Sequence, residues 1–174
     1  METPYTVAAA ILAEVLEAFA AQSVTIGHSM VAVGAVMLDG CCDGSLIVAP
    51  ERVYRIDSTA GFPAEASVDG RCGNLIGVDM LVRVDRCVPV IEAGLNGRIK
   101  VPSDAAQEEA FRIVLRDAAI VWNAVVSEAM LGEDEEWERA SVVQRYDGPQ
   151  GDCLASETRF TIGIDKDSWC LLTS

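Results

Sequence analysis

Apolar residues near the start of the chain recur with the period of an amphipathic helix. They are separated by four, three and four residues: Ala8, Leu12, Val15 and Phe19. Thr3 suits the N-cap position, and Pro4 is favoured at the first position of a helix. The pattern therefore predicts a helix over residues 4–22, with one apolar stripe facing a core.

Shorter apolar runs follow this helix, and turn residues separate them. Met30–Leu38 is rich in Val and Ala and ends at an Asp-Gly turn signal. Residues 46–48 and 52–56 predict two short strands, because Pro50 lies between them. Residues 57–74 contain four Gly or Pro residues and predict a long loop or arm.

The clearest strand pattern lies in residues 76–88. Apolar side chains occupy one face: Val78, Met80, Val82 and Val84. The other face carries three charges: Asp79, Arg83 and Asp85. Only Leu81 breaks the alternation, and the charged face is expected to meet water or a partner subunit.

A long helix and two strands are expected in the second half of the chain. Asp104, with Gln107 three residues later, resembles a capping box at the start of a helix that ends near residue 131. Its predicted apolar stripe consists of Phe111, Leu115, Ala118, Trp122, Val125 and Ala129. The two strands are expected at about 137–146 and 157–164, joined by a loop at 148–151.

These elements predict an α+β fold formed by a single domain over residues 1–174. Strands occur in runs and do not alternate regularly with helices, which favours a mostly antiparallel sheet. The N-terminal helix and the long central helix would cover that sheet with their apolar stripes. The length of 174 residues is typical of one domain.

Charge excludes one broad class of function. The chain has 13 basic and 27 acidic residues and a net charge of −14, so it does not resemble a basic nucleic-acid binder. The densest acidic block is a candidate acidic surface: Glu133, Asp134, Glu135 and Glu136. It is either a solvated loop or a negative surface that DNA passes without binding. No membrane segment is expected, because the apolar stretch 7–21 is too short and carries Glu14 and Glu17.

The six cysteines are expected to be buried or partly buried free thiols, as in a reducing compartment. They lie at positions 41, 42, 72, 87, 153 and 170. No Cys-x-x-Cys pair exists, and the single histidine cannot complete a zinc set, so no metal site is predicted. Cys87 is interpreted as a small apolar residue of a strand. A metal site through Cys41 and Cys42 is the alternative.

No catalytic and no cofactor-binding residues are predicted. Gly27-His28-Ser29 looks like the start of a hydrolase nucleophile elbow, but Val31 replaces its last glycine. The only histidine, His28, also precedes the serine, whereas the triad histidine of that fold follows it. Phosphate-binding glycine motifs are absent from the sequence. We therefore expect that the protein is not an enzyme and that it needs no cofactor.

With these elements in order, the sequence resembles the tail terminator proteins of long-tailed bacteriophages and, more loosely, neck connector proteins. The layout is a helix, a strand region with a long loop, a long helix and a closing hairpin. Cys72-Gly73 with the strand 78–89, and Trp137 with the segment 146–153, resemble connector proteins of phages that infect actinobacteria. The preference for Arg over Lys, 11 against 2, suits a GC-rich host.

This resemblance implies a structural role in the virion. Copies of the chain, six in the family's pattern, would form a ring that caps the tail tube and ends its polymerisation. The implied partners are the chain itself, the major tail tube protein and the head stopper or connector protein, with DNA passing through the lumen and no membrane. Assembly would take place in the host cytoplasm. The alternatives are an adaptor, stopper or tube protein, a small acidic enzyme, or a binding module.

Ring closure requires a surface that contacts the next copy. The candidates are the charged face of strand 76–88 with Asp79, Arg83 and Asp85, the loop 57–74, and the tail 167–174. The tail is included because Trp169 and Leu171 make an apolar ending after a polar turn.

Overall fold

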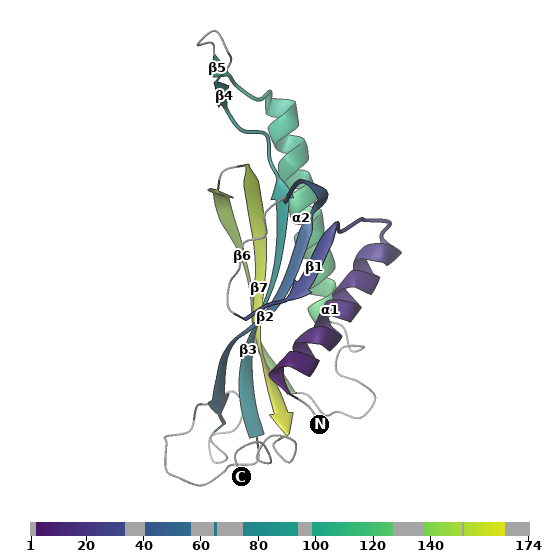
Figure 1. Ribbon diagram of the computed structural model, residues 1–174, viewed down its shortest axis with the longest axis vertical. Helices are drawn as coiled ribbons and strands as arrows, with labels where there is room; N and C mark the ends of the chain where they lie inside the picture. The colour runs from purple at the N-terminus through teal and green to yellow at the C-terminus, as the bar shows by residue number, and fades with distance from the viewer. Residues whose placement is uncertain are drawn as a thin grey trace.

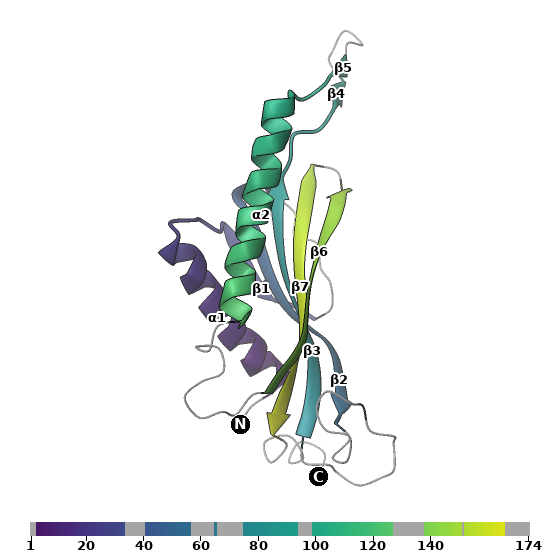
Figure 2. The ribbon, with the colours of Figure 1, turned by 180° about the vertical axis from the view of Figure 1, so that it is seen from behind.

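The chain folds around one long, twisted sheet that carries both helices on the same face (Figures 1 and 2). This computed structural model describes residues 3–33, 41–56, 65, 75–93, 99–126, 138–150 and 152–165. The helical elements are α1 (Pro4–Ala21), the short 3-10 helix η1 (Cys41–Asp43) and α2 (Asp104–Val126). The strands are β1 (His28–Val31), β2 (Ser45–Arg55), β3 (Leu75–Cys87), β4 (Glu92–Ala93), β5 (Ile99–Lys100), β6 (Glu138–Gln150) and β7 (Cys153–Asp165).

The main sheet has the strand order β1-β2-β3-β7-β6, and β4 and β5 form a separate two-stranded ribbon. β3 and β7 pair antiparallel along their whole length, from Leu75 opposite Asp165 to Cys87 opposite Cys153. β1 pairs parallel with β2. The α+β class is therefore confirmed, and the sheet is mixed, with one parallel pair in an otherwise antiparallel ladder.

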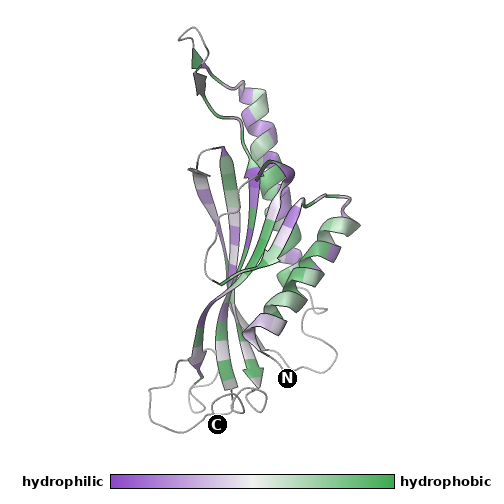
Figure 3. Cartoon of the chain, in the orientation of Figure 1, coloured by the Kyte–Doolittle hydropathy of each residue, from purple (hydrophilic) through white to green (hydrophobic). Residues whose placement is uncertain are grey.

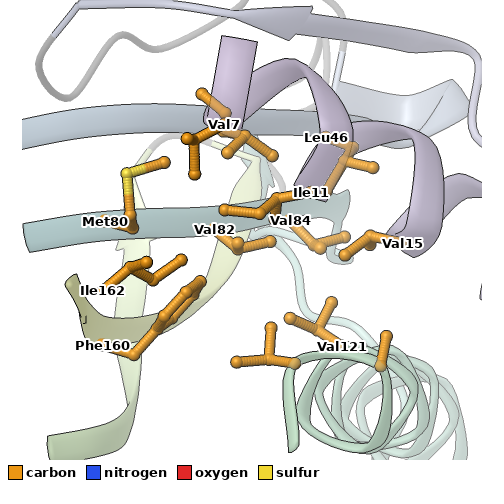
Figure 4. Close-up of a cluster of buried hydrophobic side chains, with 14 of the residues drawn as sticks. Val7, Ile11, Val15, Leu46, Met80, Val82, Val84, Val121, Phe160 and Ile162 are labelled. Atoms are coloured by element: carbon orange, nitrogen blue, oxygen red, sulfur yellow. The ribbon is translucent and has the colours of Figure 1, made fainter. Parts of the chain in front are cut away.

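The core lies between the sheet and the two helices (Figure 4). The alternation predicted for β3 is confirmed, because its four even-numbered valine and methionine side chains are all buried in this layer. Phe160 and Ile162 of β7 point into the same layer, as does Val121 of α2 (Figure 4). Each such fully buried side chain contributes about 1.5–3 kcal/mol relative to exposure.

The first helix begins as its sequence predicts. Thr3 accepts a hydrogen bond from the Thr6 N–H at 3.1 Å, and the Thr6 side chain completes a capping box. Most of the helix is apolar (Figure 3), and by length and composition it could cross a membrane. Its buried stripe packs on the sheet, however, and consists of Val7, Ala8, Ile11, Val15 and Phe19.

The second helix turns a different stripe to the core from the one expected. Its buried residues are Ala110, Val114, Asp117, Ala118, Ile120, Val121, Ala124 and Val125. Phe111 and Leu115 are 53% and 55% exposed, so the first half of the predicted stripe faces away from the core. The cap is also one residue earlier, because the Ser103 hydroxyl accepts the Ala106 N–H at 3.2 Å. Trp122, expected in the stripe, is half-buried.

Two strand boundaries differ from expectation. β2 is one strand that runs through Pro50, and the ladder shifts register between Pro50 and Arg52, so the proline sits at an irregularity where strands tolerate it. β6 continues to Gln150, with a second shift between Asp147 and Gln150, so most of the predicted loop 148–151 belongs to the strand.

Candidate functional site

A cluster of ion pairs lies on the face of the sheet opposite the helices. Arg83 donates to Asp85 at 2.8 Å and to Glu157 of β7 at 3.0 Å. Its third partner is Asp147 of β6, at 3.4 Å. Arg159 continues the cluster by donating to Glu51 at 3.1 Å. We call these six residues the charged cluster, and they join β2, β3, β7 and β6.

The three residues at the centre of the charged cluster are buried, so each charge there needs a partner of opposite sign. Arg83, Asp85 and Glu157 are 5%, 2% and 3% exposed. Burial alone would lower the pKa of Arg83, but the hydrogen bond and the charge of Asp85, helped by Glu157, raise its pKa above the ordinary value. Arg83 therefore stays charged and neutralises carboxylates that would otherwise be costly to bury.

The expectation that these charges meet water is therefore wrong for Arg83 and Asp85. The cause is the pairing of β3 with β7 and of β7 with β6, which brings Glu157 and Asp147 to Arg83 on the same face. Asp79 remains half-buried, accepting from Arg52 at 2.8 Å and from Thr161 at 2.7 Å. A role of this face in contact with another copy stays a prediction, and Asp79 is the most accessible of the three residues predicted for it.

A second polar contact lies on the helix face, at the same end of β3. Arg86 donates to the buried Asp117 of α2 at 2.5 Å and to the Thr25 carbonyl at 3.2 Å. Gly44 has φ +81 and lies against the Arg86 guanidinium. This contact joins the loop after α1, the start of β2, the end of β3 and the middle of α2.

Cysteines gather where β3 ends and β7 begins. Cys42 of η1 and Cys87 form a disulfide, and Cys153 is also disulfide-bonded. The expectation of free thiols is therefore wrong for these residues. Asp152 lies with them, since ligand atoms of Cys42, Cys87 and Asp152 are all within 4.8 Å of one another. We call Cys42, Cys87, Asp152 and Cys153 the cysteine cluster.

The β4–β5 ribbon projects beyond the main sheet, past the first turn of α2 (Figures 1 and 2). At its base is an apolar hollow of about 390 Å³, whose lining includes Val90, Ile91, Val101 and Phe111. Exposed apolar side chains continue along the ribbon and α2. We call the most exposed of them the ribbon surface: Ile91 (65%), Ile99 (69%), Val101 (63%), Phe111 (53%) and Leu115 (55%).

Several predicted site residues lie outside the described residues. They are Glu133 to Glu136, Trp169 and Leu171, together with all of the loop 57–74 except Glu65. Glu65 is exposed and pairs with Arg52 at 3.0 Å. The ribbon surface was not predicted from the sequence, although Val90-Ile91 and Ile99…Val101 flank a turn-rich stretch and are apolar.

The lining of the hollow at the base of the ribbon is almost entirely apolar. Among the residues that line the hollow, Gln107 is the only polar one and none is titratable. His28 and Ser29 are exposed on β1, at the edge of the sheet. No protein-family model matches this chain, and no curated protein is similar enough to count as a relative.

Proposed function

We propose that this protein is a structural component of a long-tailed phage virion, in which a ring of copies caps the tail tube and joins it to the head. The observation that carries the proposal is the ribbon surface. Large exposed apolar patches mark interaction sites, because leaving them in water costs free energy that association recovers. Here five large apolar side chains lie on or beside one projecting element.

The ribbon surface suits contact between copies in a ring. A ring needs a heterologous interface, in which one patch of each copy meets a different patch of the next. A projecting ribbon reaches beyond its own body, and the apolar hollow at its base offers a surface that a neighbour can fill. We propose that the ribbon of one copy packs on the Phe111 side of α2 in the next.

Charge supports the passage of DNA through such a ring. Every copy contributes a net charge of −14, so the ring as a whole repels the phosphate backbone. DNA would pass without binding and would not stall. The tail tube protein and the head stopper protein would bind the two ends of the ring, and the protein itself would carry no catalytic activity.

The first prediction concerns assembly through the ribbon surface. The purified chain is expected to form rings with a mass near six times 18.6 kDa, measured by light scattering and seen with a central hole in negative-stain images. The double variant Ile91→Asp, Phe111→Asp should release monomers, because the two replacements place two charges in an apolar contact.

A matched control separates this contact from a general effect of charge. Tyr5 on α1 is as exposed as Ile91, at 65%, and Tyr5→Asp should leave the rings intact. Rings that survive the Ile91 and Phe111 replacements would rule out the ribbon contact. A wild-type chain that forms no ring alone and caps no preformed tail tube would overturn the proposed function.

A further inference from the structure

The cysteine cluster brings two sulfurs and a carboxylate together from three distant parts of the chain. Cys42 comes from η1, Cys87 from the last position of β3, and Asp152 from just before β7. Their ligand atoms lie within 4.8 Å of one another. Cys153 adds a third sulfur, 3.7 Å from the Asp152 carboxylate.

Strand register explains why two of these sulfurs meet. Cys87 and Cys153 are directly opposite each other at the end of the β3–β7 ladder. The Val88 N–H donates to the Asp152 carbonyl at 2.7 Å, which makes Cys87 and Cys153 a non-hydrogen-bonded pair. Side chains approach most closely at such pairs, and both cysteines point to the same face of the sheet.

Backbone contacts hold the Cys42 sulfur near those of Cys87 and Cys153. The Gly27 N–H donates to the carbonyls of Asp43 and Gly44, each at 3.0 Å, and these contacts fix the end of η1 next to β1. β2 then pairs with β3 from Ser45 opposite Asp85 onward. Cys42 is therefore held near the end of β3 by the residues that follow it, which bond to Gly27 and lead into β2.

We propose that the cysteine cluster, in its thiol state, binds a zinc ion through the sulfurs of Cys42, Cys87 and Cys153 and the carboxylate of Asp152. Four ligands of these types match structural zinc sites, which are tetrahedral and prefer thiolate sulfur. With zinc–ligand distances of about 2.0–2.3 Å, neighbouring ligand atoms lie about 3.3–3.8 Å apart. Reduction lets the bonded sulfurs of Cys42 and Cys87 separate to this spacing, and the Asp152 carboxylate already lies within 4.8 Å of both. The Cys153 sulfur, 3.7 Å from the Asp152 carboxylate, completes the set.

The disulfide between Cys42 and Cys87 is the oxidised state of the same site. Cys153 is also disulfide-bonded, so each disulfide must be reduced: a dithiol reductant supplies two electrons and two protons per disulfide and is itself oxidised to a disulfide. Zinc then displaces the thiol protons as it binds. In a reducing cytoplasm the thiol state prevails, and cysteine clusters there bind metal more often than they stay oxidised. The proposal does not depend on the ring, because it concerns a single chain.

A zinc ion at this position would stabilise the base of the projecting ribbon. The segment that leads to β4 begins at Val88, directly after Cys87, and Val88 is hydrogen-bonded to Asp152. A metal ion that joins η1, β3 and β7 would fix the direction in which the ribbon leaves the sheet. We therefore expect a structural zinc site, closed by four protein ligands, with no catalytic water.

The test measures zinc directly on the full chain. Protein produced with zinc present and kept reduced during purification is expected to hold about one zinc ion per chain by elemental analysis. Zinc should also protect the three clustered cysteines from alkylation, as mapped by peptide mass spectrometry. Reduced wild-type protein that holds no zinc, or whose cysteines alkylate equally fast with and without zinc, would overturn the proposal.

Variants then test the ligands. Cys87→Ser should abolish zinc retention, and Asp152→Asn should weaken zinc affinity at least tenfold in a competition with a chromogenic chelator. Glu14→Gln, which replaces an exposed carboxylate on α1, is the control and should retain zinc fully. Zinc retained equally by Cys87→Ser would show that these sulfurs are not the ligands. If Cys87→Ser does not fold, the alkylation experiment on wild-type protein decides whether these cysteines bind zinc.

Discussion

Replacing Arg83 with methionine is expected to lower the free energy of unfolding by about 3–5 kcal/mol. The guanidinium is 5% exposed and contacts Asp85 and Glu157, which are 2% and 3% exposed. Methionine fills a similar volume but takes from the buried Asp85 its arginine partner, whereas Glu157 keeps its ion pair with Arg159 at 2.6 Å. Removing one partner of a buried ion pair strands the other charge, and this loss exceeds what the intact pair contributes.

Arg52 provides the matched control for this replacement. It also pairs with two carboxylates, Asp79 and Glu65, but its side chain is 55% exposed. When an exposed ion pair is broken, water solvates the remaining charges. Arg52→Met should therefore lower the free energy of unfolding by no more than about 1 kcal/mol. Urea unfolding curves of both variants measure the difference, and equal losses would mean that burial does not set the cost.

The elements that the sequence predicts well are those with purely local signals. α1 has its cap, its first-turn proline and its apolar period within residues 3–22. The alternation of β3 is equally local, and it identifies the core face correctly. In both cases the spacing of apolar residues within the element itself marks the face that packs on the core.

Where the prediction fails, a distant partner has changed the outcome. Asp117 is fully buried on α2, where Arg86, 31 residues away, and the adjacent Arg116 both pair with it, and this orientation of the helix leaves Phe111 and Leu115 outside the core. A hydrophobic stripe alone would not place a carboxylate in the core. The exposure of Phe111 and Leu115, the part of the ribbon surface that lies on α2, follows from this orientation of the helix.

The candidate sites depend on strand pairing even more than the helices do. Arg83 and Glu157 are 74 residues apart, and Cys42 and Cys87 are 45 residues apart. Neither spacing forms a motif, so the sequence alone leaves these residues unconnected. The β2–β3 and β3–β7 registers bring them together. Only the charge alternation of β3 hinted that its second face has a role.

Replacing Gly44 with alanine is expected to lower the free energy of unfolding by about 3 kcal/mol, through two separate effects. Its φ of +81 is costly for any residue with a side chain, by about 1–2 kcal/mol. An added Cβ would also overlap the Arg86 guanidinium, whose Cζ would lie 2.6 Å away. Moving Arg86 weakens its hydrogen bond to the buried Asp117, and a bond to a charged group is worth about 1.5–3 kcal/mol.

Two further variants separate these effects. Gly148 has open space where a Cβ would stand, so Gly148→Ala should change stability by no more than about 0.5 kcal/mol. In an Arg86→Ala background the overlap is gone, and Gly44→Ala should then cost only the backbone part, about 1–2 kcal/mol. Denaturation of the four proteins in this cycle gives the coupling between Gly44 and Arg86. A coupling near zero would show that the backbone alone requires glycine, and that Arg86 is free to move aside.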